Sequence, residues 1–341
     1  MQREDTPDET IRVAVAGIGE HAEHRLLPAI ASVPSLRLSA VATREAGKAA
    51  RLRERYPGVR IFHDSADEGW LAAADLLVAG GPPDFNAAVV ARGLRSGKHV
   101  FCEKPLATSA VQIDALLTQA RAAPQSTTAL GLNLKYSATV NELVARAADD
   151  PVVTAYVEYA TSKPTEPAWG APSTAITCAW WHAIHVLDLL QTIIGRARLS
   201  AVKLDRLDHP HVAIHGELDG DQARGSFLIR NSAPAFSLTI RVLSRSGTVT
   251  TLTDLRTLSV SGPARSAGAA VAHYRKQPAE FSISPLADNV DCSGFRSMFA
   301  QVARAIAGRS QPPSSFQAVA GAHALLFELV ERLSLQEQPS T

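Results

Sequence analysis

Two residues of this sequence, Lys104 and His185, are of types that suit proton transfer. Lys104 follows the apolar run His99–Cys102, which is predicted to be a strand, and it stands between Glu103 and Pro105. Burial and a neighbouring cationic group lower the pKa of a lysine, which can then exchange a proton with a carbonyl oxygen at neutral pH. His185 can orient or protonate a substrate oxygen. Taken alone, a Lys-Pro pair after a strand also fits an exposed turn, so the prediction depends on the motifs around it.

A glycine-rich turn near the start of the chain predicts a dinucleotide site. The segment Gly17–Ala22 reads Gly-Ile-Gly-Glu-His-Ala and follows the apolar run Ile11–Ala16. Small residues at this spacing allow a tight turn and a close approach of the backbone to a pyrophosphate, which binds at the N-terminus of the next helix. The motif alone also fits an ordinary strand-to-helix turn. Its place at the first strand-to-helix junction favours the dinucleotide site.

The end of the second predicted strand, Leu36–Ala42, indicates which dinucleotide binds. An NAD-specific site has an acidic residue here, which accepts a hydrogen bond from the ribose 2′-hydroxyl. Thr43 and Arg44 follow the strand instead, and a guanidinium suits a 2′-phosphate. The sequence therefore predicts NADP(H) as the preferred cofactor, with NAD(H) possible. Two alternatives remain: the Arg44 side chain is solvated and binds no phosphate, or Glu45 is the residue that binds the ribose.

The elements that must position these residues alternate between short apolar runs and helical patterns up to about residue 130. This alternation is typical of parallel βαβ units and predicts an α/β Rossmann domain, a doubly wound parallel sheet, over residues 11–130. Pro28 lies inside the first helical stretch and is expected to kink or shorten it. The predicted strands are Ile11–Ala16, Leu36–Ala42, Leu76–Ala79 and His99–Cys102, and the helical patterns lie near Ala22–Ser32, Glu45–Tyr56, Phe85–Ser96 and Ser109–Ala122.

After residue 131 the pattern changes to longer alternating runs, which predict a second, C-terminal α/β domain over residues 131–335 with a mainly antiparallel sheet. The segment Thr161–Thr177 is expected to be a long loop, and such loops are often functional. The predicted strands are Val152–Ala160, Leu199–Leu207, His211–Leu218, Gln222–Ile229 and Phe236–Leu243, and the predicted helices are Ala179–Ile194, Phe295–Ala307 and Phe316–Leu333.

Composition limits the class of protein further. At 341 residues and 46% apolar content the chain can form two domains, and 34 basic against 33 acidic residues give no field that would attract nucleic acid or an anionic membrane. The start of the chain lacks the pattern of a secretory signal, and no apolar run is long enough for a membrane span. We therefore expect a cytoplasmic protein that acts on a small molecule. Its widely spaced cysteines are expected to be reduced thiols, and they are Cys102, Cys178 and Cys292.

Two motifs together resemble those of a known family. The segment Gly97–Ala107 reads Gly-Lys-His-Val-Phe-Cys-Glu-Lys-Pro-Leu-Ala, and with Gly17 and Gly19 it is similar to the glucose-fructose oxidoreductase, inositol dehydrogenase and MocA (Gfo/Idh/MocA) family of NAD(P)-dependent oxidoreductases. The resemblance covers most of the first domain and continues into Asn133–Tyr136. It implies that the second domain has an open antiparallel sheet, whose exposed face commonly forms dimers or tetramers. We therefore expect a homodimer or homotetramer, with the second domain serving substrate binding and oligomerisation.

The resemblance also implies roles for the residues around Lys104. Lys104 is expected to act as the proton donor or acceptor, and Glu103, Lys104 and Pro105 are expected to position the nicotinamide, with a cis peptide bond before the proline. Tyr136, at the domain junction, is expected to line the cleft that holds the substrate.

The family's second signature, Asp-x-x-x-His-x-x-Asp on a helix, is only partly present. His185 and Asp188 match it, but Trp181 stands where the first aspartate is expected. An indole at this position offers an apolar platform for a sugar face or for a heterocyclic substrate, with core packing beside Trp180 as the alternative. His182 is expected to line the same pocket. His182 and His185 have a spacing that suits a metal, but no third ligand joins them, so no metal is expected.

These observations predict an NADP-dependent oxidoreductase that transfers hydride between the nicotinamide and a carbonyl or alcohol carbon of a sugar-like or biosynthetic small molecule. Lys104 is the expected general acid/base and His185 assists it. A C=N (cyclic imine) reductase on the same fold is one alternative, because an imine needs a proton donor but less help from an Asp–His pair. A non-catalytic nucleotide-binding sensor is the other. The expected cofactor-binding residues are Gly17, Ile18, Gly19, Glu20, His21, Thr43, Arg44, Pro82, Glu103 and Lys104, and the expected substrate-binding residues are Tyr136, Trp181 and His182.

Overall fold

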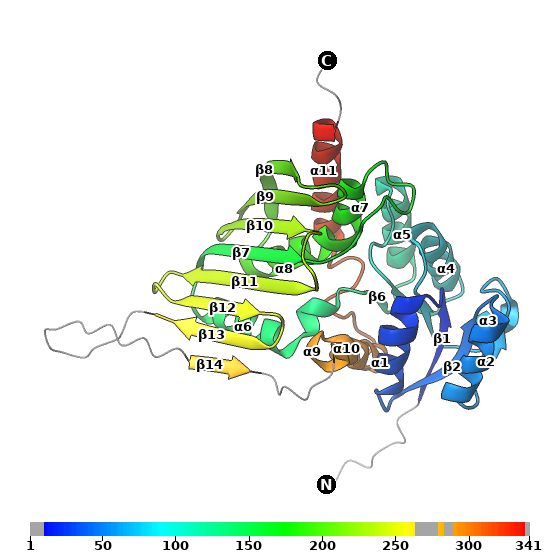
Figure 1. Cartoon of the computed structure of the whole chain (residues 1–341). Helices are drawn as coiled ribbons and strands as arrows, with labels where there is room; N and C mark the ends of the chain where they lie inside the picture. The colour runs from blue at the N-terminus through cyan, green and yellow to red at the C-terminus, as the bar shows by residue number, and fades with distance from the viewer. Residues whose placement is uncertain (1–9, 263–278, 283–288, 338–341) are drawn as a thin grey trace, which may run out of the picture. The chain divides into compact units, whose positions relative to one another are not determined.

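The computed structural model describes residues 10–262, 279–282 and 289–337, and its chain forms two compact units (Figure 1). The first unit runs to Asn133 and also takes in Gly294–Ala320, and the second contains Leu134–Ser293 and the residues from Gly321 onward. The segment Gly294–Ala320 therefore belongs with the first unit, although the boundaries expected from the sequence put it in the second. Its helix α10, Phe295–Ala307, packs on the first unit, where the Phe299 ring lies 4.8 Å from the ring of Phe101.

Six parallel strands form the sheet of the first unit, among the residues described, in the order β3-β2-β1-β4-β5-β6. This is the strand order of a Rossmann fold, and it confirms the predicted doubly wound sheet. All four predicted strands are present with the predicted bounds. The two additional strands, β3 and β6, have three residues each, which is too short for a periodic pattern. The strands are β1 (Ile11–Ala16), β2 (Leu36–Ala42), β3 (Arg60–Phe62), β4 (Leu76–Ala79), β5 (His99–Cys102) and β6 (Thr128–Leu130).

The central strands of this sheet are apolar because helices cover both of their faces. Every residue of β4 is buried, as are Val13 and Val15 of β1 and Phe101 of β5. The helices that follow the strands are α2 (Ala46–Arg55), α3 (Glu68–Ala72), α4 (Pro83–Arg95) and α5 (Ala110–Ala122).

The first helix of the unit accommodates Pro28 with a π-helical turn. This turn, η1 (Ala22–Leu26), leads directly into α1 (Leu27–Ala31), and the Leu27 N–H donates to the carbonyl of Ala22, five residues back. A proline lacks the N–H that an α-helix needs, and a widened turn can absorb the mismatch. Of the two expected effects of Pro28, a kink or a shortening, the shortening is not seen, because the helix continues through Pro28 to Ala31.

Eight strands form the sheet of the second unit within the described ranges, in the order β14-β13-β12-β11-β7-β10-β9-β8. Among its described strands, β7 and β10 are the one parallel pair, so the sheet is mainly antiparallel, as predicted. The predicted strands end within one or two residues of the observed ones, and β12, β13 and β14 are additional. The strands are β7 (Val152–Ala160), β8 (Ala197–Arg206), β9 (Val212–Gly220), β10 (Arg224–Arg230), β11 (Ser237–Ser244), β12 (Val249–Thr253), β13 (Thr257–Ser261) and β14 (Ala279–Ser282).

Helices pack on one face of this second sheet (Figure 1). Helix α8 (Ile184–Ile194) contacts β7 and β10, and α6 (Ala138–Asp149) contacts β12 and β13. The C-terminal helix α11 (Ala320–Glu337) starts four residues later than the predicted one. Across the part of the chain that the structure covers, no helix has both the length and the apolar content needed to cross a membrane.

Candidate active site

The glycine-rich turn after β1 packs against the loop after β4. Gly17 has a φ of +80°, and a Cβ atom there would lie 2.3 Å from the backbone nitrogen of Gly81, so only glycine fits. Gly19 is different, because a Cβ atom there would meet nothing within 4 Å. Open space beside Gly19 at the start of a helix is the arrangement that a pyrophosphate needs, and the turn therefore fits a dinucleotide.

A buried asparagine holds the loop after β4 in place. Asn86 donates from Nδ2 to the Gly81 carbonyl over 2.7 Å, and its Oδ1 accepts from the Gly81 N–H over 2.8 Å. Pro82, which the sequence analysis assigned to the cofactor site, is extended and lies directly between this loop and α4. Asn86 is not among the residues predicted from the sequence, although its position in the first turn of a helix that opens with two prolines is a usable signal.

Two basic side chains, Arg44 and Lys48, follow the end of β2. Arg44 is 74% exposed, and its Nη2 lies 2.5 Å from Oδ2 of Asp64. Lys48, which the sequence analysis missed, donates from Nζ to the Ile18 carbonyl over 2.6 Å and lies 2.8 Å from the Glu45 carboxylate. Lys48 therefore links the glycine-rich turn to the residues that follow β2. Lys48 lies in the first turn of α2, whereas Arg44 precedes that helix, so no helical spacing in the sequence points to the contact of Lys48 with the turn.

Glu103 connects the end of β5 to the glycine-rich turn. This buried carboxylate lies 3.5 Å from Nε2 of His21 through Oε1, and its Oε2 accepts from the Lys104 N–H over 3.3 Å. It lies against Gly131, where a Cβ atom would be 2.5 Å from Oε1. The structure thus brings together Gly17, His21, Glu103 and Lys104 at the carboxyl ends of parallel strands, where open α/β sheets bind their ligands.

Lys104 has the electrostatic environment that a proton-transfer group requires. Burial lowers the pKa of its ammonium group, while the negative charge of Glu103 acts in the opposite direction. The peptide bond between Lys104 and Pro105 is cis, as expected. A lysine whose pKa is lowered exchanges protons more readily near neutral pH than an exposed one.

The second group of predicted site residues lies on one helix of the second unit. This helix begins with α7 (Thr174–Cys178), passes through the π-helical turn η3 (Ala179–Ala183) and continues as α8. The predicted start at Ala179 was therefore five residues late, and the preceding loop ends at Ser173. The reason is a cap, because Ser173 Oγ accepts from the Ile176 N–H over 3.2 Å.

The π-helical turn contains both Trp181 and His182, and such turns are frequent at functional sites. Trp180 is buried and its ring contacts Phe327 at 5.4 Å, so Trp180 is the tryptophan that packs in the core. Trp181 is only partly buried, and its ring lies 5.5 Å from that of Trp169. The structure therefore favours a surface position for Trp181 over the alternative of core packing.

A tyrosine of β7 lies against both histidines, and the sequence analysis did not assign it. The Tyr159 ring stacks on that of His182 at 4.9 Å and lies parallel to that of His185 at 6.3 Å, with an angle of 6° between the planes. Burial raises the pKa of the Tyr159 hydroxyl. Strand parity indicates that Tyr156 and Tyr159 face opposite sides of the sheet, but only the structure shows which of them faces the helix.

Asp188 pairs with Lys135 inside the second unit. The Lys135 ammonium lies 2.8 Å from Asp188 Oδ1, and the two side chains are 12% and 7% exposed. Burial raises the pKa of Asp188, and the lysine acts in the opposite direction. Tyr136, next to Lys135, is buried, as is His185. Asp188, the aspartate of the second signature, therefore forms an ion pair with Lys135.

Among the described residues, no group of three or more histidine, cysteine, aspartate or glutamate side chains could hold a metal ion. The side chains of Cys102, Cys178 and Cys292 are buried thiols.

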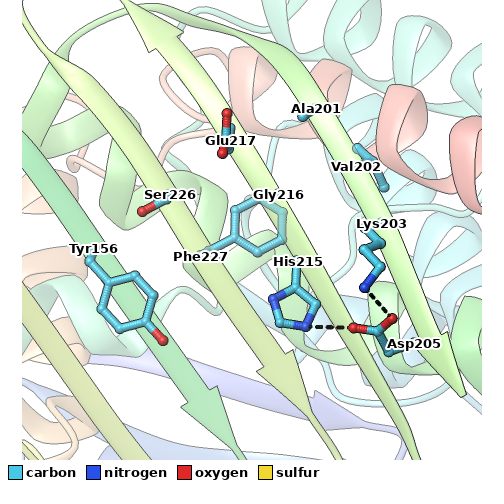
Figure 2. A pocket seen from close by; sticks show the side chains of 10 residues that line it. All are labelled: Tyr156, Ala201, Val202, Lys203, Asp205, His215, Gly216, Glu217, Ser226 and Phe227. Atoms are coloured by element: carbon cyan, nitrogen blue, oxygen red, sulfur yellow. Dashed lines mark ion pairs between the residues drawn. The ribbon is translucent and has the colours of Figure 1, made fainter.

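A separate hollow lies on the opposite, open face of the second sheet (Figure 2). Its volume is about 340 Å³, and Tyr156 and Glu217 line it. Figure 2 shows His215 and Lys203 directed at Asp205, with ion-pair distances of 3.1 and 2.7 Å. None of the predicted site residues lines this hollow, so it is distinct from the candidate site.

Comparison with known proteins agrees with this description. Residues 11–129 match the model of an oxidoreductase family with an NAD-binding Rossmann fold. A dTDP-3,4-didehydro-2,6-dideoxy-α-D-glucose 3-reductase from Actinomadura kijaniata is 35% identical over 116 residues, which are 33% of this chain and 33% of the relative. The chain thus matches about a third of the length of this curated relative.

Solved structures share the fold over almost the whole chain. A dehydrogenase from Chromobacterium violaceum has a TM-score of 0.86 and 22% identity, with 96% of this chain and 98% of that chain covered. GenD2 from gentamicin A biosynthesis, in complex with NAD, has a TM-score of 0.76 and 21% identity, with 97% of this chain and 95% of that chain covered. Both units therefore have counterparts in single chains of known structure.

Proposed function

We propose that this chain, whose residues 11–129 match the model of the Gfo/Idh/MocA oxidoreductase family, transfers hydride between the nicotinamide of NADP(H) and a carbonyl or alcohol carbon of a sugar-like molecule. One observation carries this proposal. Lys104 lies at the carboxyl end of β5, where partial burial lowers the pKa of its ammonium group, and the neighbouring Glu103 contacts His21 of the glycine-rich turn. A proton-transfer group is thus held next to the predicted cofactor site.

Each residue has a defined task in this proposal. A bound nicotinamide would supply the hydride in the reductive direction and accept it in the oxidative direction. In the reductive direction Lys104 Nζ donates a proton to the carbonyl oxygen, and in the oxidative direction it accepts the alcohol proton. Glu103 holds the backbone of Lys104, and His185 orients the reacting oxygen. Gly17 and Gly19 leave room for the pyrophosphate.

We propose NADP(H) as the preferred cofactor, because Arg44 and Lys48 place two cations after β2. Arg44→Ala is expected to weaken NADPH binding by about ten- to a hundredfold and to leave NADH binding nearly unchanged, since a charge-assisted hydrogen bond contributes about 1.5–3 kcal/mol. Fluorescence titration with both nucleotides measures this. Arg53→Ala, at an exposed position of α2, is the matched control. Wild-type affinities for NADPH and NADH that agree within threefold would contradict the NADP assignment.

A substrate panel tests the reaction itself. Oxidation of NADPH by ketosugars, with the corresponding alcohol as product, is the expected result. Trp181 in place of the signature aspartate gives specific support to a second candidate, reduction of a C=N bond. Turnover of a cyclic imine but of no ketosugar would favour that candidate.

We also propose that the protein is a homodimer or homotetramer assembled through the open face of the second sheet. This face carries exposed Leu243 of β11, whose partner on β7 is Thr154, and half-buried Tyr156 two residues further along β7. Leu243→Glu places a charge on it, and we expect the variant to have a lower mass than the wild type in sedimentation equilibrium. A monomeric wild type at micromolar concentration would contradict the proposal.

A further inference from the structure

Arg44 has an anionic partner at the edge of the sheet where the ribose of the cofactor is expected. Strands β2 and β3 are parallel neighbours, and Ala42 pairs with Phe62. Arg44 and Asp64 each lie two residues beyond this pair, so they leave the sheet side by side. Their side chains meet, with Arg44 Nη2 2.5 Å from Asp64 Oδ2. A phosphate that binds Arg44 must therefore share the guanidinium with a carboxylate.

The loop after β3 fixes this carboxylate in place. Its other oxygen, Asp64 Oδ1, accepts from the Ala66 N–H over 2.9 Å. Arg92 of α4 donates to the Ser65 carbonyl, which ties the loop to a second element. The Ala66 N–H and, after it, Arg44 lower the pKa of Asp64, which is therefore ionised at neutral pH. Arg44 thus faces a negative charge that is held at a defined position.

The pair is open to solvent, so a ligand can reach Arg44. The side chains of Arg44 and Asp64 are 74% and 40% exposed, and ion pairs this exposed are weak. Lys48, the other cation after β2, is only 12% exposed, and its Nζ donates to the Ile18 carbonyl. Lys48 is therefore held at the glycine-rich turn, whereas Arg44 can turn from Asp64 toward a phosphate.

We infer that Asp64 sets how strongly the protein prefers NADP(H) over NAD(H). It competes with the 2′-phosphate for Arg44, and its charge repels the phosphate, so it lowers the affinity for NADP(H). NAD(H) has an uncharged hydroxyl in place of the phosphate, so its affinity is not lowered in this way. Asp64 thus narrows the preference that Arg44 creates. The inference rests on the proposed function for the place of the 2′-phosphate, and it adds a second residue that determines the preference.

Asp64→Asn tests the inference, because it removes the charge and keeps an oxygen for the Ala66 N–H. In fluorescence titrations of the full-length protein, the variant should bind NADPH about three- to tenfold more tightly than the wild type, and NADH within about twofold of it. The gain should fall below about twofold when Arg44→Ala is also present, because no guanidinium is then left to compete for. It should also shrink between about 0.05 and about 0.5 M KCl, since salt screens exposed charges. The matched control is Glu54→Gln, which removes an exposed carboxylate from α2 and should change neither affinity by more than about twofold.

The outcomes separate this inference from the proposed function, because equilibrium binding needs no turnover. A gain that is confined to NADPH and depends on Arg44 supports the role of Asp64, whether or not a substrate is reduced. If Asp64→Asn gives no gain while Arg44→Ala still weakens NADPH binding, the inference is overturned and the NADP assignment stands. An equal gain with and without Arg44, an equal gain for NADH, or a gain that salt does not change overturns the competition as well. Binding of neither nucleotide to the wild type removes the proposed function, and the inference with it.

Discussion

Replacing Lys104 by alanine is expected to lower turnover by about 10²- to 10⁴-fold, which is the usual contribution of a general acid or base. The loss should appear in kcat, since the proton is transferred in the chemical step, and NADPH binding should change far less. Steady-state kinetics at saturating NADPH, together with fluorescence titration of the nucleotide, separates the two effects. Lys98→Ala is the matched control, because Lys98 precedes the same strand at its opposite end and donates to the Ala74 carbonyl.

The pH dependence of the wild type follows from the lowered pKa of Lys104. Reduction of a carbonyl requires the ammonium form, so reductive kcat should fall as the pH rises through that pKa, at a pH below the ordinary lysine value of 10.5. Oxidation of an alcohol requires the neutral amine, so oxidative kcat should rise over the same interval. A Lys104→Ala variant that retains more than a tenth of wild-type turnover would remove Lys104 from this role.

Replacing Asp188 by alanine is expected to lower the free energy of unfolding by about 3–5 kcal/mol. The variant leaves the buried ammonium of Lys135 without the carboxylate 2.8 Å away that neutralises it. Urea denaturation followed by circular dichroism measures the loss. The control is Asp219→Ala, which removes the partner of Arg198 in an exposed ion pair and should cost less than about 1 kcal/mol.

A second variant tests whether the cost comes from the uncompensated charge. The double substitution Asp188→Leu with Lys135→Met replaces the pair by apolar side chains, and it should recover much of the stability lost in Asp188→Ala. A loss below 1 kcal/mol in Asp188→Ala, or a double variant less stable than the single one, would contradict this account of the pair.

The parallel sheet could be predicted because its strands are short apolar runs, each followed by a helical pattern. Strands β3 and β6 escaped prediction because three residues show no periodicity. The pattern of Phe295–Ala307 predicts a helix with the observed bounds. It does not show which core the helix joins, and this helix packs on the first unit although it follows the strands of the second. The unit that this helix joins is decided by contacts with residues that are remote in sequence.

The candidate site could be predicted where a residue type is dictated locally. Gly17 is such a residue, because its left-handed backbone conformation at the strand-to-helix turn favours glycine. Lys48 and Tyr159 were missed because their positions follow from tertiary contacts: a carbonyl of the turn, and two imidazoles on a helix. Asn86 was missed although its partner Gly81 lies only five residues earlier in the sequence. Sequence spacing reveals the periodicity of an element, but not its neighbours.

Transfer of an isotope from cofactor to product tests the central claim most directly. NADPH deuterated at nicotinamide C4 is incubated with the wild-type protein and a panel of ketosugars and cyclic imines, and the products are analysed by mass spectrometry and NMR. The account predicts deuterium on the carbon that carried the carbonyl oxygen, formed at a rate that falls about 10²-fold or more in Lys104→Ala. NADPH binding without deuterium in any product would contradict hydride transfer and favour a nucleotide-binding sensor.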